Sequence, residues 1–351
     1  MTWDVALILA IDGLANGAVY LLAGLGLVLI FSVTRVVFVP FGDVVAFAAL
    51  TLAAFETDRT PATIGLVLTL AGLGVIVEVA ALLRQREPAR IPRALLGWGV
   101  LPALPCLAAW AISGHAAPPV VRIVVAIALV VPIAPLVARL ALQPIADASP
   151  LVLLIASLAL HFLLSGLGLL FFGPEGSRTG PLADGAITLP GGFPLSAQVM
   201  LMIAAAVVLS ALFYLLFERT VTGKALRATA VNRVGARLVG IRPTRTALLA
   251  YTLASLLAGL IGVLVAPVTT MYYDSGFLIG LKAFVAAIIG GLVSYPLTAL
   301  GALAVGGVES FASFWSGAFK DVIVFSLLIP ALMLRSFLAQ QVDEDAEEID
   351  Q

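Results

Sequence analysis

The sequence of 351 residues is poor in charge, cysteine and histidine. Only 11% of its residues are charged and 62% are hydrophobic, whereas about a quarter of the residues of a soluble domain are charged. So little charge cannot cover a surface that faces water, and lipid must therefore be the solvent for most of the chain. The sequence predicts an integral membrane protein.

The scarce residue types also limit the chemistry. Cys106 is the one cysteine, which excludes an internal disulfide and a cysteine-based metal cluster, and two histidines do not favour a histidine-rich metal site. The pattern GxxxxGK[ST], which binds nucleotide phosphates, is absent, as are GxSxG and HExxH. We therefore expect a protein that is not an enzyme, with no catalytic residue, no bound metal and no cofactor of its own.

Long apolar runs make up most of the chain. A bilayer core about 30 Å thick is crossed by roughly 20 apolar residues in a helix. Runs of this kind predict an all-α, polytopic transmembrane bundle of about 9–11 spans. The candidate spans are 4–34, 41–56, 62–83, 94–113, 119–142, 150–172, 196–217, 246–271, 279–293, 297–314 and 320–337.

Two of these ranges, 41–56 and 279–293, are short for a full crossing. We expect them to be broken or re-entrant elements, which persist only where they are packed inside protein. The chain begins MTWD, without the positive stretch of a cleavable signal peptide, so we expect the first apolar run to be retained. Residues 1–338 are predicted to form one transmembrane domain. A disordered acidic tail follows at 339–351, because six of the twenty acidic residues fall within 343–350.

Lys and Arg are unevenly distributed along the chain, and short cytoplasmic loops hold the excess of positive charge in membrane proteins. With the N-terminus outside, fourteen of the nineteen basic residues fall on the cytoplasmic side. This orientation also places the C-terminus in the cytoplasm. The fourteen are Arg35, Arg84, Arg86, Arg90, Arg93, Arg139, Arg219, Lys224, Arg227, Arg233, Arg237, Arg242, Arg245 and Arg335.

Seven of these basic residues fall within 218–245, which reads GKALRATAVNRVGARLVGI from Gly223 to Ile241. Apolar side chains recur there every four residues and predict one helix with a single apolar stripe. Gly240 followed by Pro243 ends that helix. The pattern leaves two interpretations open: a basic amphipathic helix that lies on anionic lipid, or a docking helix for a cytoplasmic partner. The stripe consists of Leu226, Ala230, Val234 and Leu238.

Ionisable side chains within membrane spans are rare because each costs several kcal/mol there. Lys282 and Glu309 lie in neighbouring C-terminal segments, and a cation beside a carboxylate would let both stay charged away from water. We expect them to pair, either as a structural link between two helices or as part of a substrate path. His161, in an otherwise apolar run, is expected to be a hydrogen-bonded packing residue rather than a proton relay.

Glycines concentrate in the first span and in the last third of the chain. Small residues let helix backbones pack closely, and they also allow helix breaks beside a ligand. Asn16 and Tyr20 on the first span, with the short element 279–293, are candidates to line a substrate path. Close packing without any ligand is the alternative interpretation.

Several stretches resemble the membrane permease subunits of ATP-binding cassette importers for branched-chain amino acids and related amides. The strongest is GLKAFVAAIIGGLVSYPLTALGALAVGGVES at 280–310, which is similar to the family's Lys-Ala-Phe, Gly-Gly and intramembrane Glu signature. The stretch 223–241 resembles the family's coupling loop. Further similar stretches are GLANGAVYLLAGLGLVLIFSVTRVVFVPFGD (13–43), DASPLVLLIASLALHFLL (147–164) and FFGPEGSR (171–178).

The resemblance implies an ATP-driven importer in the bacterial inner membrane. This chain would form the translocation path with a second permease subunit, identical or homologous. Two cytoplasmic ATP-binding subunits would use ATP and Mg, and an extracytoplasmic solute-binding protein would deliver the substrate, with no nucleic acid involved. The coupling segment would meet the ATPase through Lys224, Arg227, Ala230, Val234, Arg237, Leu238 and Gly240. The substrate path would include Asn16, Tyr20, Lys282, Phe284, Gly290, Gly291 and Glu309.

The sequence departs from the family pattern in places. The turn at 38–43 and the stretch 143–146 differ from the usual sequences, and Asn232 and Arg233 stand where many members have an acidic pair. Residues 84–118 resemble an insertion, which we expect to add two helices.

A rival function is consistent with the same residues. A secondary transporter or channel could use Lys282 and Glu309 as coupling charges, with the basic segment 218–245 as a lipid anchor. A scaffold protein is a third class, but it leaves the glycine-rich, charge-bearing C-terminal third without a role.

Overall fold

The computed structural model describes residues 3–115, 117–188 and 194–333, so Arg335 and the acidic tail at 339–351 lie outside the described residues. Within these ranges eight helices are long and apolar enough to cross a membrane, which confirms the all-α, polytopic class. They are Trp3–Thr34 (α1), Thr63–Arg84 (α3), Pro88–Ile112, Pro119–Ile145, Pro150–Phe172 (α8), Ala197–Arg219 (α9), Pro243–Val265 (α12) and Tyr295–Trp315 (α14).

Two of the eight spans are built from shorter helical pieces, because prolines interrupt them. The first joins η1 (Pro88–Arg90), α4 (Ile91–Ala94), the π-helical turn η2 (Leu95–Val100) and α5 (Leu101–Ile112). The second joins α6 (Pro119–Val130), α7 (Ile133–Val137), the π-helical turn η3 (Ala138–Leu142) and η4 (Gln143–Ile145). The range 84–118 therefore holds one span, and the expectation of two helices in it is wrong.

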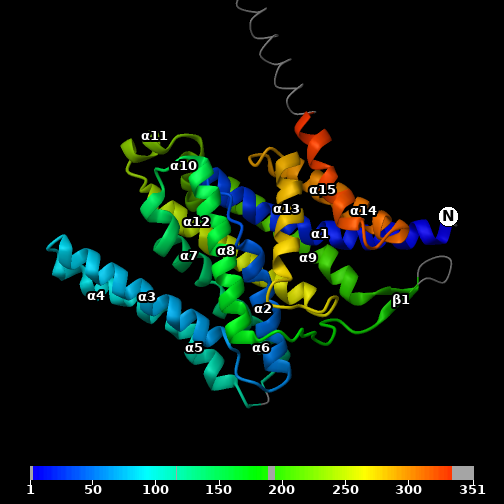
Figure 1. The fold of residues 1–351 in the computed structure, drawn as a ribbon, viewed down its shortest axis with the longest axis horizontal. Helices are drawn as coiled ribbons and strands as arrows, with labels where there is room; N and C mark the ends of the chain where they lie inside the picture. Colours follow the sequence, from blue (N-terminus) through cyan, green and yellow to red (C-terminus); the bar gives the residue numbers. More distant parts are fainter. Residues whose placement is uncertain (1–2, 116, 189–193, 334–351) are drawn as a thin grey trace, which may run out of the picture.

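The remaining elements are short (Figure 1). The two ranges predicted to be short are helices α2 (Phe41–Glu56) and α13 (Gly276–Ile289). Two helices, α10 (Val221–Val231) and α11 (Arg233–Leu238), join α9 to α12, and α15 (Lys320–Ser326) follows α14. A small hairpin pairs β1 (Ala186–Thr188) with β2 (Pro194–Ser196) in antiparallel register, with Ile187 opposite Leu195.

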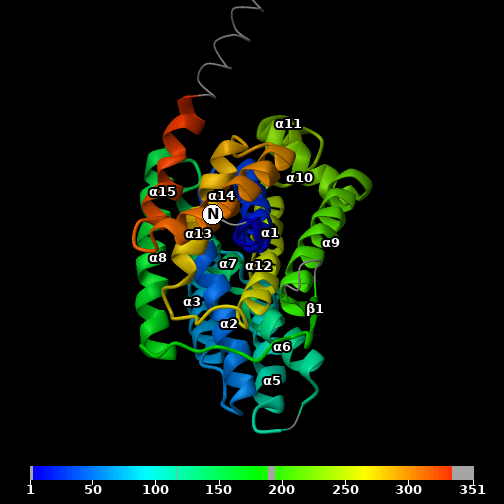
Figure 2. The same ribbon diagram turned by 90° about the vertical axis from the view of Figure 1, so that its right-hand side faces the viewer.

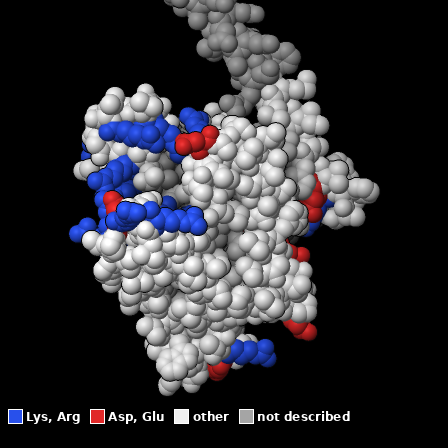
Figure 3. Space-filling view, turned by 60° about the vertical axis from the view of Figure 1, so that its left-hand side comes forward, with Lys and Arg blue, Asp and Glu red and all other residues white. Residues whose placement is uncertain are grey.

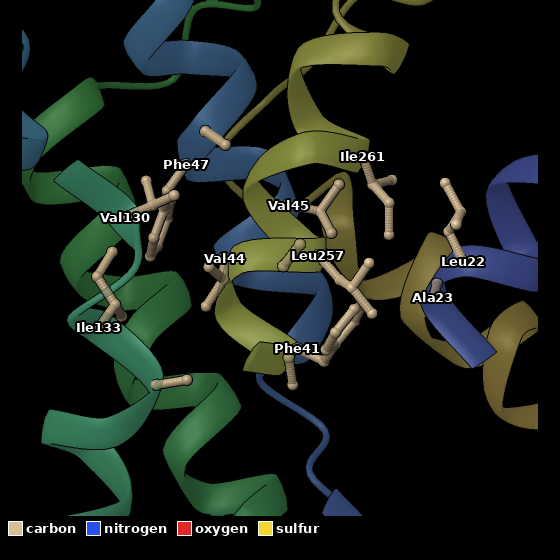
Figure 4. Close-up of a cluster of buried hydrophobic side chains, with 14 of the residues drawn as sticks. Leu22, Ala23, Phe41, Val44, Val45, Phe47, Val130, Ile133, Leu257 and Ile261 are labelled. Atoms are coloured by element: carbon tan, nitrogen blue, oxygen red, sulfur yellow. The ribbon is translucent and has the colours of Figure 1, made fainter. Parts of the chain in front are cut away.

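Helix α2 forms the centre of the core, since nearly every one of its residues is buried. Figure 4 shows Phe41, Val44 and Val45 of α2 among side chains from α1, α6, α7 and α12. A Cβ on Gly262 of α12 would overlap the Val45 carbonyl, and the backbones of Gly42 and Gly276 meet just as closely. A short element enclosed on all sides fits the prediction that it is packed inside protein.

Helix α12 ends earlier than the apolar run predicts. The sequence favours a helix over 246–271, whereas α12 spans Pro243–Val265. Pro267 explains the difference, because a residue before proline is disfavoured in the helical conformation. The chain after α8 then supplies partners for the free carbonyls: Gln198 Nε2 donates to Leu264 O at 2.8 Å, and Arg178 Nε donates to Pro267 O at 2.9 Å.

Helices α1 and α14 pack along a seam of glycines and lie side by side (Figure 2). A Cβ on Gly13 would lie 2.9 Å from Cα of Gly307, and a Cβ on Gly17 would lie 3.1 Å from Cα of Leu303. A Cβ on Gly306 would overlap the backbone of Gly17. The glycines of the first span thus serve close helix packing, one of the two roles that the sequence left open.

Basic side chains gather at one end of the molecule, around a hollow (Figure 3). We call this the basic end; it carries α10, α11 and the chain that follows α1. There Arg35 Nη2 lies 3.5 Å from Ala230 O. The opposite end is tied together by Arg122 and Asp58 at 3.4 Å, and by the Gly180 amide, which donates to Glu56 at 2.9 Å.

The glycine seam predicts unequal effects of the same substitution at neighbouring positions. Gly306→Ala should destabilise the protein by about 1–3 kcal/mol, because overpacking would force α1 away from α14. Gly307→Ala is the matched control, since a Cβ there meets nothing within 4 Å. Thermal unfolding of the two variants in detergent, followed by size-exclusion chromatography, measures the difference. Equal stability of the two variants would contradict the seam.

Candidate functional site

Four side chains from four helices meet in one buried cluster. Lys282 Nζ of α13 lies 2.5 Å from Glu309 Oε1 of α14 and 2.8 Å from Asp321 Oδ1 of α15. The Tyr20 hydroxyl of α1 donates a hydrogen bond to Glu309 Oε2. Tyr20, Lys282 and Glu309 are each buried. The predicted pairing of Lys282 with Glu309 is confirmed, and Tyr20 joins it from the first span.

Because this buried charge cluster is shielded from water, each of its charges needs a partner within the protein. A charge in the membrane interior is stabilised only by a partner within reach, and Lys282 has two carboxylates beside it. Glu309 receives both the ammonium and the Tyr20 hydroxyl, so each of its oxygens is satisfied. Asp321, with a side chain 34% exposed, is the second carboxylate beside the ammonium. Whether the cluster only holds helices together or also lines a substrate path stays a prediction.

The sequence analysis missed Asp321. Its only signal was an acidic residue directly after Lys320, at the very start of the candidate span 320–337, where charged residues at a membrane surface are ordinary. The tight turn between α14 and α15 returns the chain to the level of Lys282, and only the folded structure reveals this.

The other predicted path residues occupy different surroundings. Asn16 is half-buried, one helical turn before Tyr20. Phe284 of α13 is partly buried and packs against the core. Gly290 and Gly291 form the turn between α13 and α14: a Cβ on Gly290 would overlap Thr298, and Gly291 has a φ of 72°. The path role of these four residues stays a prediction.

A second buried pair links α2 to α8. His161 Nδ1 lies 2.9 Å from each carboxylate oxygen of Asp43, and the imidazole stacks on Phe277 with ring centroids 4.4 Å apart. His161 therefore has the hydrogen bond and the packing contact that the sequence predicts, while its lack of a relay role stays a prediction. Its partner was not foreseen, because Asp43 lies in the first turn of α2, where an acidic residue is ordinary on helix-dipole grounds.

A third cluster connects the spans around the range 84–118. Arg139 Nε donates to Glu78 at 3.0 Å, and its Nη1 donates to Gln143 at 2.9 Å. The Arg139 guanidinium also lies over the Trp98 ring, 5.8 Å from its centroid. The span Pro88–Ile112 is thus attached to its neighbours through a cation–π contact.

The basic segment 218–245 folds as two helices rather than one. The chain leaves the helical conformation at Asn232, where φ is −150° and ψ is 105°, and the Asn232 side chain accepts from the Gly235 amide at 2.9 Å. Asparagine is a strong N-cap residue and a weak interior one, so it ends α10 and starts α11. The prediction of one continuous helix is wrong, and its end at Gly240, with a φ of 85°, is confirmed.

The break divides the predicted apolar stripe. Leu226 is fully buried and Ala230 is half-buried, whereas Val234 and Leu238 are 67% and 84% exposed. The four side chains therefore do not form one surface. The exposed apolar ridge at the basic end, which we call the α11 ridge, consists of Val231, Val234, Leu238 and Val239.

Basic residues border the α11 ridge. Lys224 and Arg227 line a groove of about 430 Å³ between α10 and α11, and Arg237 is exposed on α11. Arg227 Nη2 donates to Glu218 at 2.5 Å, and this hydrogen bond raises the pKa of the guanidinium above its ordinary value. The segment thus presents apolar and cationic groups together.

Tight backbone contacts fix the segment to the spans. A Cβ on Gly223 would overlap the Leu216 carbonyl, so α10 crosses the end of α9 without room for a side chain. Arg35 reaches the Ala230 carbonyl from the end of α1. Among the described residues, no group of three or more His, Cys, Asp or Glu could hold a metal ion.

Crossing helices, buried ion pairs within them and an exposed basic segment at one end define a polytopic membrane protein. The chain belongs to the family described as branched-chain amino acid transport system / permease component, which matches residues 9–334. It is therefore a multi-pass permease, and the resemblance seen in the sequence is confirmed.

Curated relatives carry the same description. The chain is 30% identical over 206 residues to the high-affinity branched-chain amino acid transport system permease protein LivH of Salmonella typhimurium, covering 56% of this chain and 66% of the relative. LivH of Escherichia coli matches to the same extent. The permease protein BraD of Pseudomonas aeruginosa is 36% identical over 127 residues, or 34% of this chain and 40% of the relative. The chain thus covers just under two thirds of the LivH proteins. No solved structure matches it.

The buried charge cluster predicts that removing Lys282 lowers the free energy of unfolding and that also neutralising Glu309 restores part of it. Lys282→Met should cost about 3–5 kcal/mol, because it leaves Glu309 charged and buried without a cation. Adding Glu309→Gln removes that charge and should recover much of the loss. Thermal unfolding in detergent compares the two variants with the parent protein. A single variant as stable as the parent would show that the ion pair contributes nothing.

Proposed function

We propose that this chain is the membrane-spanning subunit of an ATP-driven importer for branched-chain amino acids or related amides. It forms the translocation path with a second permease subunit. Two cytoplasmic ATP-binding subunits drive the cycle, and an extracytoplasmic solute-binding protein delivers the substrate. The observation that carries the proposal is the α11 ridge: exposed apolar side chains bordered by arginines, at the end where the basic loops gather.

The orientation in the proposal rests on charge. Most basic residues of the described chain gather at the basic end, in the short segments that join its spans and in the adjoining helix ends, and such segments rich in Lys and Arg stay in the cytoplasm. Cytoplasmic ATP-binding subunits would therefore meet α10 and α11 first. An apolar ridge with a basic border suits a groove with an acidic rim, because the apolar contact gives affinity and the charges give register.

A displacement of the α11 ridge would be transmitted directly to the membrane spans. Helix α10 is tied to α9 at Gly223 and to the end of α1 through Arg35. Helix α11 leads within a few residues to Pro243, where α12 begins. A rigid displacement of the segment would thus move α1 and α12 together.

Helix α1 also reaches the buried charge cluster. Tyr20 of α1 bonds to Glu309 of α14, so movement of α1 would change the contacts of the carboxylate. Lys282, held between two carboxylates, can shift between them without losing all charge compensation. In the proposed cycle this cluster opens and closes the path between the two permease subunits.

The docking role predicts a loss of assembly from surface changes alone. Arg237→Glu with Leu238→Asp should reduce co-purification of the ATP-binding subunits at least tenfold, because both residues are exposed on α11 and a buried charge opposes docking. The matched control is Arg59→Glu with Ile187→Asp, which makes the same change in charge and replaces a similar apolar side chain at exposed positions of the opposite end. Undiminished co-purification of the α11 variant would reject the docking role.

The energy source separates the proposal from the rival secondary transporter. Vesicles that hold the whole complex should take up labelled leucine, isoleucine or valine only when ATP is inside and the solute-binding protein is outside. Vesicles that hold this chain alone should show no uptake under an imposed proton gradient. Gradient-driven uptake without ATP would instead support Lys282 and Glu309 as coupling charges. Including short amides in the panel identifies the substrate class.

A further inference from the structure

An apolar hollow lies away from the buried charge cluster and the α11 ridge. A groove of about 1040 Å³ runs between the spans Pro88–Ile112 and Pro119–Ile145 and helix α12. Its walls are almost wholly apolar and include Trp98, Leu101, Leu104, Leu248, Leu256 and Leu260. All three walls belong to helices long and apolar enough to cross a membrane, so the groove lies at the depth of the bilayer core.

Prolines give the groove its concave shape. Pro102 and Pro105 of one span, and Pro132 and Pro135 of the other, all line it. A proline removes a helical hydrogen bond and bends the helix, so both spans are bent where they line the groove. Helix α6 stays packed on α12, because a Cβ on Gly259 would lie 3.1 Å from the Val130 side chain. Ser255 of α12 donates to the carbonyl freed at the break, Val130 O, at 3.0 Å, which holds the bent helix in place.

The groove is as deep as one leaflet of a bilayer. From Leu248 to Leu260 it follows α12 for about 18 Å at about 1.5 Å per residue. One leaflet contributes about 15 Å, half of a hydrocarbon core of about 30 Å. A helix of another protein would cross both leaflets, whereas an acyl chain ends where this groove ends.

Two arginines mark the entrance of the groove at the basic end. Arg245 precedes Leu248 by three residues and Arg93 precedes Gly97 by four, so each lies on the helix face that lines the groove. Both are exposed. Neither forms an ion pair within residues 3–115, 117–188 and 194–333, whereas Arg139 nearby is already paired with Glu78.

We infer that this groove binds an anionic glycerophospholipid, with an acyl chain along its apolar walls and the phosphate between Arg93 and Arg245. The charge, the depth and the polarity of the groove match that one class of molecule. A helix of a second subunit matches less well, because helices pack in membranes through small residues. The glycine seam of α1 and α14 is such an interface, while leucines and Trp98 wall the groove.

Trp98 in the wall is a natural reporter of the bound lipid. In the full-length protein the three other tryptophans, all at least 69% exposed, are changed to Phe. The protein is reconstituted in phosphatidylcholine vesicles with a small fraction of brominated phosphatidylglycerol or of brominated phosphatidylcholine. We expect brominated phosphatidylglycerol to quench Trp98 more strongly. A second protein, with Trp110 as its one tryptophan, should show equal quenching by both lipids, because Trp110 faces bulk lipid.

The arginines are tested by a matched pair of double variants. Arg93→Ala with Arg245→Ala should lower the preference of Trp98 for the anionic lipid by about tenfold to thirtyfold, since a basic residue near an anionic surface contributes about 1 kcal/mol. Arg84→Ala with Arg219→Ala removes the same charge from exposed positions that do not line the groove, and should leave the preference unchanged.

Three outcomes would overturn the inference. Equal quenching of Trp98 by both lipids would mean that the groove takes bulk lipid without recognising the headgroup. No quenching by either lipid would mean that protein covers the groove, as a second subunit would. An equal loss in both double variants would assign the preference to net charge rather than to Arg93 and Arg245.

Discussion

The absence of water from the bilayer core is the constraint on which this structure depends, because every polar group in the spans needs a partner within the protein. In the buried charge cluster Lys282 and Glu309 are partners of each other, and Asp43 is the partner of His161. Ser255 is the partner of a carbonyl at a proline break. Each solution joins two or more helices, so the polar contacts that lipid makes necessary also fix how the helices are arranged.

Glycines make those polar contacts possible. The seam between α1 and α14 brings the two backbones together, and this approach lets the Tyr20 hydroxyl reach Glu309 on the neighbouring helix. At the other side of the core, Gly42 and Gly276 bring α2 against the start of α13, beside the pair of Asp43 and His161. Charge pairing therefore depends on close packing, because replacing the glycines with larger residues would separate the paired side chains.

The periphery follows different rules. The spans Pro88–Ile112 and Pro119–Ile145 are bent by prolines and expose large apolar side chains to lipid. At the basic end, α10 and α11 attach to α9 and α1 through tight contacts yet leave the α11 ridge uncovered. The first surface suits lipid and the second suits a soluble partner, because one lies along the spans and the other lies beyond their ends.

The sequence by itself determined the membrane class, nearly all helix positions, the shortness of α2 and α13 and the pairing of Lys282 with Glu309, because hydropathy and rare buried charges are local signals. It failed where a distant contact or one residue's local preference decided the outcome. Asn232 split one amphipathic pattern into two helices and turned half of its stripe inward. Asp321 joined the buried cluster through a turn that no periodicity encodes. Only the tertiary structure decides which side chains face each other, since partners in space come from segments far apart in the chain.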